Sequence, residues 1–369
     1  MFQKSCLYLF FLLLVANSPA QGQTPDYQFT DIVRLDPSPV KDQCRTGTCW
    51  SYSTTSFLES EIQRQTGQTL DLSEMFNVRM TYPEKAEMYL RLHGLHQFGP
   101  GSLNHDVLHV LEHHGVVPES VYSGLPAGET FHDHGHLDAL LLGMVEVARD
   151  RKWSVSDPVW NQALAAVLDV YLGAVPETFD VNGETHTPLS YRDALGLDAN
   201  KYVSLTSFTH HPYEASFVLE IPDNFARKSF WNVELDQLEK AVTAALDRGY
   251  TVAWDADVSE RGFDFRLGLA VLLAKGEELS DEQVLEPAVT AASRQMGFDD
   301  FSTTDDHLMH IVGYANDQDG DLFFIVKNSW GGENLFGGYQ YVSLPYFRAK
   351  TISILLHENG LPKGTIRKM

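Results

Sequence analysis

The spacing of apolar residues changes along this chain of 369 residues. After Cys49, apolar residues recur at the interval of one helix face until Gly67 supplies a stop signal; they are Trp50, Phe57, Leu58 and Ile62. The second half instead contains short runs typical of strands, namely TVAWD, LMHIVGYA, LFFIVKN, YQYVSL and TISILL. We therefore predict an α+β fold, in which a helical N-terminal half precedes an antiparallel β half and a cleft lies where they meet.

Further helices are expected after Ser73, through Val107 and Leu111 to Gly115, and from Leu235 to a cap near Gly249. The middle of the chain combines a His-rich loop with a helix that carries Leu164, Leu168, Tyr171 and Leu172, and we interpret it as an insertion. The predicted organisation is a signal peptide (1–20), an N-terminal arm (21–40), the helical half (41–124), the insertion (125–198), the β half (199–357) and a C-terminal tail (358–369).

The first residues are typical of a secretory signal peptide rather than of the fold. Lys4 precedes an apolar run from Leu7 to Ala16, and the small residues Ser18 and Ala20 follow it. The run is too short for a membrane span, which needs about twenty apolar residues. We expect an exported protein, periplasmic or secreted, that has no membrane association after cleavage.

Charge and cysteine content exclude several classes of partner and scaffold. The formal net charge of −23 provides no general basic face, which argues against nucleic acid or an anionic membrane as a partner. Only Cys44 and Cys49 remain after the predicted signal peptide, so there is no disulfide framework.

Cys49 is the candidate nucleophile. A thiol attacks carbonyl groups as the thiolate, and the start of a helix lowers a thiol pKa because partial positive charge and free N–H groups lie there. His310 is the candidate base, because it lies within a predicted strand and shares a face with Leu308 and Val312. His307 is the rival, and a regular strand would point it to the opposite face.

Three further side chains complete the hypothesis. Asn328 ends the next predicted strand, where a hairpin would bring its amide oxygen beside His310 to orient the imidazole. Trp330 follows closely and could shield that hydrogen bond from water. Gln43, six residues before Cys49, can direct its amide at the oxygen that becomes negative during attack, together with the backbone N–H of Cys49.

The segments QCRTGTCWSYS, LSEMF, HLMHIVGYA and VKNSWGG occur in the order of the Gln, Cys, His and Asn blocks of the papain superfamily, which this chain resembles. Trp50 and Trp330 fall within these blocks as supporting residues. Within the superfamily the chain is most similar to the bleomycin hydrolase and aminopeptidase C group. The segment FGPGSLNHD resembles the glycine segment that binds substrate in the family, which implies substrate-binding roles for Gly99 and Gly101.

The resemblance implies a papain-like fold in which the antiparallel β half is barrel-like. It also implies thiol-dependent hydrolysis of peptide bonds by a Cys-His-Asn triad, with peptide substrates and no cofactor. It further implies an aminopeptidase in which the carboxylate of a C-terminal arm holds the substrate's α-amino group. Hexameric assembly also occurs in this group.

Alternatives stay open at this point. An endopeptidase would accept N-blocked substrates, whereas a catalytically inactive relative would only bind peptides. A transglutaminase-like acyltransferase would usually orient the base with Asp rather than Asn. The HDHGH segment, with His132, His134 and His136, offers histidines to a metal, but no spaced partner completes a tetrahedral set, so no metal site is predicted.

Overall fold

The computed structural model describes residues 26–126, 128–280 and 282–366. The predicted signal peptide (1–20), the start of the predicted N-terminal arm and the last residues of the tail, Met369 included, lie outside these ranges. Among the described residues, no helix combines the length and the apolar character needed to cross a membrane.

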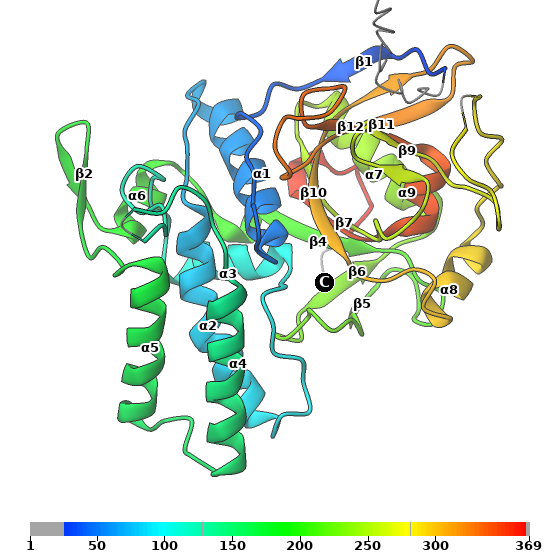
Figure 1. Ribbon diagram of the computed structural model, residues 1–369. Coiled ribbons are helices and arrows are strands. Elements are labelled where there is room, and N and C mark those ends of the chain that lie inside the picture. Colours follow the sequence, from blue (N-terminus) through cyan, green and yellow to red (C-terminus); the bar gives the residue numbers. More distant parts are fainter. Residues whose placement is uncertain (1–25, 127, 281, 367–369) are drawn as a thin grey trace, which may run out of the picture.

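Helices fill the first half of the described chain (Figure 1). They are α1 (Cys49–Thr66), α2 (Glu74–Arg91), α3 (Asn104–His113), α4 (Gly135–Asp150), α5 (Pro158–Leu172) and α6 (Pro188–Ala194). Helix α1 ends as predicted, because Gly67 takes the left-handed conformation that a glycine tolerates best. The hydroxyl of Ser73 caps α2 by accepting a hydrogen bond from the backbone N–H of Phe76 at 3.0 Å. The predicted start of α2 is therefore confirmed.

The region predicted as an insertion contains α4, α5, the hairpin β2 (Phe179–Val181) and β3 (Glu184–His186), and α6. Helix α5 was predicted from its apolar spacing, and Leu164, Leu168 and Leu172 are buried. The sequence interpretation missed α4, although its buried residues Leu137, Leu141 and Val145 follow a strict four-residue interval. In Figure 1, α4 and α5 project side by side, away from the sheet.

The second half forms one large sheet. The remaining strands are β1 (Thr30–Arg34), β4 (Tyr202–Thr206), β5 (Ala215–Val218), β6 (Ser229–Asn232), β7 (Val252–Ala256), β8 (Phe263–Asp264), β9 (Leu269–Ala270), β10 (His307–Asn316), β11 (Leu322–Lys327), β12 (Tyr339–Ser343) and β13 (Thr351–His357). The order is β5-β6-β4-β13-β7-β10-β11-β12-β9-β8, and β1 pairs with β10. The helices α7 (Leu235–Asp247), α8 (Ala291–Asp299) and α9 (Leu344–Lys350) accompany it, with short 3₁₀ turns at Ala199–Lys201 and Glu358–Gly360.

The prediction of an antiparallel, barrel-like β half needs correction. The pairs β4–β6 and β12–β9 are parallel, so the sheet is mixed. Within the described residues its order runs from β5 to β8 without closing into a barrel. These pairings could not be predicted from the sequence, because strands as short as β9 leave no clear sequence pattern.

Two of the three hydrophobic cores among the described residues lie on opposite faces of the sheet and differ in origin. Leu308, Ala253 and Leu355 pack with the buried side chains of α1 and the other early helices. On the opposite face, Met309 and Trp254 pack with α7 and α9. This alternation follows the two-residue period of a strand, and it places α1 directly against β10 (Figure 1).

The described part of the C-terminal tail follows the β half. Arg248, which follows α7 directly, donates hydrogen bonds to the carbonyl oxygens of Gly360, at 3.0 Å, and Leu361. Ile366 packs against the core that contains α7.

Candidate active site

Cys49 is the first residue of α1 and lies at the junction of the helical half and the sheet. Its side chain is only 8% exposed. The backbone N–H of Leu308, in β10, stabilises the ionised form of its sulfur. The nucleophile candidate therefore contacts the start of the strand that carries both histidine candidates.

His307, not His310, is the histidine that meets Asn328. The Nε2 atom of His307 lies 2.8 Å from Oδ1 of Asn328. The Nδ2 atom of Asn328 donates to Oε1 of Gln340 at 2.6 Å, which fixes the orientation of the Asn328 amide. Because Oδ1 can only accept, His307 carries its proton on Nε2, and Nδ1 is left as the basic nitrogen.

Trp330 covers this histidine. Its ring stacks on the imidazole of His307 with the centroids 4.5 Å apart and the planes 25° from parallel. Phe263 and Phe265 in turn contact the indole edge-on. The aromatic cover limits the access of water to the hydrogen bond between His307 and Asn328, as predicted for Trp330 but with the other histidine.

The predicted contact between His310 and Asn328 is wrong. His310 is 1% exposed, and its Nδ1 atom lies 2.9 Å from the hydroxyl of Ser56 in α1. Nζ of Lys327 donates to the same hydroxyl at 2.7 Å. Burial, followed by the charge of Lys327, holds the pKa of His310 well below its ordinary value, so the imidazole is a neutral interior group.

The position of His310 away from Asn328 follows from how α1 packs along β10. Cys49 contacts Leu308, the hydroxyl of Ser53 donates to the carbonyl of Met309 at 2.6 Å, and Ser56 reaches His310. Ser56 is seven residues after Cys49 in the helix, which corresponds to about 10 Å at about 1.5 Å per residue. His310 therefore shares the face of Leu308, as predicted, but lies about two helix turns beyond the sulfur.

Gln43 is fixed beside the same residues. Its Nε2 atom donates to the carbonyl of Thr46 at 2.8 Å, and its Oε1 atom accepts from the hydroxyl of Ser329 at 2.7 Å. Its backbone N–H also donates to the carbonyl of Ser329 at 2.8 Å. An amide nitrogen has two hydrogens, so Nε2 keeps one for another acceptor.

The glycine segment lies next to the nucleophile loop. The indole N–H of Trp50 donates to the carbonyl of Pro100 at 3.0 Å. Buried Lys85 donates to the carbonyls of Gly99, at 2.8 Å, and Gly101. A Cβ atom on Gly101 would collide with the carboxylate of Asp223, so a larger residue here would require Asp223 to shift.

Burial dominates the electrostatics of the resting site. It raises the pKa of the Cys49 thiol to about 12, with smaller contributions in the same direction from Asp305, Asp223 and Asp255. Burial also lowers the pKa of His307 to about 4, against the hydrogen bond to Asn328. The prediction that the helix start gives a low thiol pKa is wrong, because desolvation outweighs the effect of the helix start; the thiol and the imidazole are both neutral.

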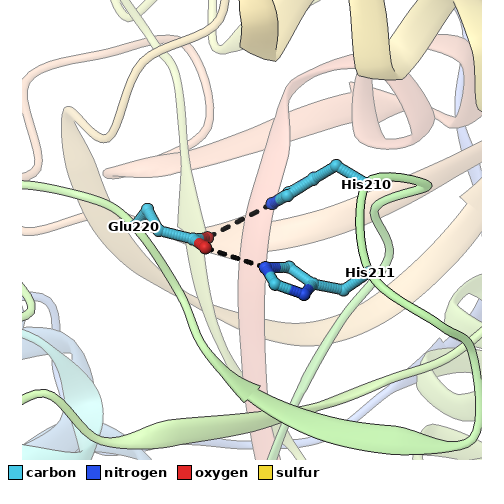
Figure 2. Close-up of side chains that lie close together, drawn as sticks. All are labelled: His210, His211 and Glu220. Carbon is cyan, nitrogen blue, oxygen red and sulfur yellow. Dashed lines mark hydrogen bonds and ion pairs between the residues drawn. The ribbon is translucent and has the colours of Figure 1, made fainter.

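A separate cluster has the ligand types of a metal site. Among the described residues, His210, His211 and Glu220 form the group whose ligand atoms lie within 4.8 Å of one another. Figure 2 shows both imidazoles directed at the Glu220 carboxylate, at 3.2 Å for His210 and 2.8 Å for His211. The described residues of the HDHGH segment, by contrast, form no group of this kind. Glu220 accepts a hydrogen bond from each imidazole, so the arrangement also fits a surface ion cluster without a metal.

Sequence reasoning missed the side chains that hold the candidates in place. Gln340 of β12 fixes Asn328, and Ser329 fixes Gln43. Ser329 lies within the quoted VKNSWGG segment and could have been found there. Gln340 carried no signal, because it reaches the site only through the pairing of β11 with β12.

Two family models match the chain. The model described as Peptidase C1-like family matches residues 167–369, which is more than half of the chain. The model described as Papain family cysteine protease matches residues 31–85. Together they cover the segments that carry Cys49, His307 and Asn328.

Individual relatives are similar over most of their length. Aminopeptidase G of Lactobacillus delbrueckii subsp. lactis is 24% identical over 367 residues, which cover 88% of this chain and 82% of that protein. Aminopeptidase W of the same organism is 24% identical over 394 residues, with 95% and 87% covered. Aminopeptidase C of Lactococcus lactis subsp. cremoris is 24% identical over 364 residues, with 89% and 82% covered.

The crystal structure of PepW from Lactobacillus rhamnosis HN001 superposes with a TM-score of 0.71 at 20% sequence identity, covering 91% of this chain and 83% of that one. This similarity confirms the predicted α+β, papain-like fold.

Proposed function

Because the chain belongs to the Peptidase C1-like family, it is a cysteine-type peptidase, and we propose that it is an aminopeptidase that acts through Cys49, His307 and Asn328. The observation that carries the assignment of the base is the 2.8 Å hydrogen bond between His307 and Asn328. It leaves Nδ1 of His307 as the basic nitrogen, and the neighbouring N–H of Leu308 reaches the Cys49 sulfur.

In the proposed reaction, Nδ1 of His307 takes the thiol proton as the sulfur of Cys49 attacks the carbonyl carbon of the peptide bond. The carbonyl oxygen becomes negative and accepts hydrogen bonds from Nε2 of Gln43 and the backbone N–H of Cys49. The C–N bond then breaks, and the leaving amine receives the proton from His307. Water hydrolyses the thioester, with His307 first accepting and then returning a proton.

The two neutral resting groups fit this cycle. Transfer of a proton from sulfur to imidazole creates an ion pair, whose charges stabilise each other and the developing oxyanion. Asn328 stabilises the imidazolium without adding a negative charge of its own, and Trp330 keeps water from that hydrogen bond. Substrate binding is then the step that favours the ionised pair over the neutral pair.

The choice of aminopeptidase over endopeptidase is supported by the relatives, which are named aminopeptidases G, W and C. An endopeptidase with the same triad is the second candidate. Peptide substrates that differ only in N-terminal acetylation separate the two, because an aminopeptidase requires the free amine.

The decisive test is hydrolysis of fluorogenic leucyl and acetyl-leucyl substrates by the parent protein, Cys49→Ala and Cys44→Ala. We expect cleavage of the leucyl substrate that falls by at least about 1000-fold in Cys49→Ala. Cys44→Ala is the matched control, because Cys44 is the other free thiol of the described chain and should retain activity. Full activity of Cys49→Ala would refute the mechanism, and cleavage of both substrates at equal rates would refute the exopeptidase assignment alone.

Export is a further part of the proposal, resting on the signal-like composition of residues 1–20. Expression with residues 1–20 in a Gram-negative host should yield a periplasmic protein whose new N-terminus lies after a small residue. An intact N-terminus in the cytoplasmic fraction would refute it.

A further inference from the structure

The cluster of His210, His211 and Glu220 takes no part in the proposed peptidase chemistry. The two histidines are adjacent in the segment between β4 and β5, and Glu220 lies just beyond the end of β5, which is an edge strand of the sheet. Figure 2 shows both imidazoles directed at the carboxylate. The side chains are 29%, 33% and 56% exposed, so an ion from the solvent can reach all three.

The separations of the donor atoms resemble those around a tetrahedral ion. The Nε2 atom of His210 lies 3.2 Å from one carboxylate oxygen of Glu220, and the Nε2 atom of His211 lies 2.8 Å from the other. All the ligand atoms lie within 4.8 Å of one another. Zinc holds such ligands at about 2.1 Å, which separates two donors of a tetrahedron by about 3.4 Å. Small side-chain movements would therefore admit an ion between the three side chains.

The second nitrogen of His210 has the kind of partner that supports a metal ligand. Its Nδ1 atom lies 3.0 Å from Nε2 and 3.3 Å from Oε1 of Gln295, in α8. The backbone N–H of Thr209 donates to the same Oε1 atom at 2.6 Å, which fixes the amide. When an ion binds Nε2 of a histidine, the proton is on Nδ1, and Oε1 of Gln295 can accept it. Ligating histidines almost always have such an acceptor, whereas a surface ion pair does not require one.

Aromatic contacts fix the planes of both imidazoles. His211 stacks on Phe217 of β5, with the ring centroids 4.1 Å apart and the planes 24° from parallel. His210 stacks on Phe298 of α8, with a centroid distance of 5.7 Å and an angle of 17°. Because the rings are held in place before an ion binds, binding costs little additional side-chain entropy.

A buried amide fixes the backbone of the histidine segment. Asn232, the last residue of β6, has an exposed fraction of 0%. Its Oδ1 atom accepts a hydrogen bond from the backbone N–H of Phe208 at 2.9 Å. Its Nδ2 atom lies 2.8, 3.0 and 3.1 Å from the carbonyl oxygens of Phe208, His211 and Pro212. The cluster is therefore mounted on a rigid segment, as a precise ligand geometry requires.

We propose that His210, His211 and Glu220 bind a divalent transition-metal ion of the zinc class, with water completing its coordination. Two imidazole ligands favour such an ion over Mg²⁺ and Ca²⁺, which prefer oxygen ligands. The ion joins the histidine segment to the end of β5, and the contact of His210 with Gln295 extends this connection to α8. Its role is to stabilise the β5 edge of the sheet.

The test measures metal binding by the full-length chain, expressed without a histidine tag and freed of metal. Cys44→Ala/Cys49→Ala is the parent for these measurements, because the two free thiols could themselves bind zinc. Calorimetry with Zn²⁺ gives affinity and stoichiometry, and the visible absorption of added Co²⁺ reports the ligand geometry. His211→Gln and Glu220→Gln are the ligand variants in this background.

His109→Gln is the matched control. Nε2 of His109 lies 3.0 Å from a carboxylate oxygen of Glu84, so this histidine also contacts a carboxylate, but within the described residues it belongs to no group of three converging ligands. Melting temperatures of the metal-free proteins show whether each variant is folded.

We expect one Zn²⁺ ion per chain, bound at least about 100-fold more weakly by either ligand variant, because loss of a supporting residue alone costs about 10–100-fold. His109→Gln should bind like the parent, and Mg²⁺ at the same concentration should not displace Zn²⁺. Zn²⁺ should raise the melting temperature of the parent but not that of Glu220→Gln. No saturable binding, or binding that both ligand variants retain, would reduce the cluster to a surface ion pair and overturn the inference. Equal competition by Mg²⁺ would overturn the assignment to the zinc class.

Discussion

His307 donates its Nε2 proton to the side-chain oxygen of Asn328, across 2.8 Å, at the start of β10. This contact selects one of the two histidines in the HLMHIVGYA segment. His310, three residues on, instead contacts a hydroxyl of α1 in the interior. The difference between them gives a direct mutational test.

Replacement of His307 by Gln should reduce kcat by at least about 100-fold, because general acid–base catalysis contributes on the order of 10²–10⁴. His310→Gln should keep kcat within a few-fold of the parent, since its imidazole lies two helix turns from Cys49. Steady-state kinetics on a leucyl substrate, with melting temperatures to confirm folding, provide the comparison. A folded His310→Gln protein as inactive as His307→Gln would contradict the assignment.

Gln43→Ala should lower kcat by about 10²–10³ with little change in KM, because the lost donor acts on charge that develops only in the transition state. Ser329→Ala removes the hydroxyl that fixes the Gln43 amide and should give a smaller decrease in kcat. If Gln43→Ala raised KM and left kcat unaltered, Gln43 would bind the ground state instead.

Gly101→Ala should destabilise the protein by about 1–3 kcal/mol, the usual cost of overpacking, because the new methyl group meets the Asp223 carboxylate. Gly99→Ala is the matched control, since its Cβ would have only Gln97 as a neighbour, at an ordinary 3.7 Å. Chemical denaturation measures both variants. Equal stability of the two would show that Asp223 moves aside freely.

Asp255 of β7, which is 0% exposed, predicts an unusual dependence of stability on pH. Between pH 3.8 and about 7, Asp255 binds more protons in the folded chain than in the unfolded chain, because burial raises its pKa. Its contribution to stability therefore falls as the pH rises through this window. Asp255→Asn cannot titrate, so its melting temperature relative to the parent should increase from pH 5 to pH 8. A relative melting temperature that stays constant from pH 5 to pH 8 would contradict the pKa shift.

The order of the helices and strands could be predicted from the sequence, because the spacing of apolar residues differs directly between the two. The helix after Cys49 ends at Gly67 as predicted, and the strands around LMHIVGYA and LFFIVKN pair as a hairpin. The choice between His307 and His310 was not readable in the same way. Strand periodicity tells which face a side chain takes, but not how far along the strand the helix start lies.

The contacts between elements far apart in the sequence could not be predicted either. Helix α1 meets β10 because Ser53 and Ser56 form hydrogen bonds to Met309 and His310, and no local pattern encodes that register. The parallel entry of β9 beside β12 likewise depends on tertiary contacts. The burial that raises the pKa of Cys49 also arises only after the two halves pack together.

Gly313 has one more consequence for the strand that bears the proposed base. Because Gly313 has no Cβ, the backbone of Val33 in β1 can approach it closely. Along one edge of β10, β7 pairs as far as Ile311 and β1 pairs from Gly313 on. Strand β11 pairs along the other edge. Backbone amides paired on both sides exchange with solvent only when the whole structure opens. The deuterium-labelling rate of residues 310–316, where both edges of β10 are paired, should therefore follow global unfolding, whereas the start of the strand at His307 is paired with β7 alone.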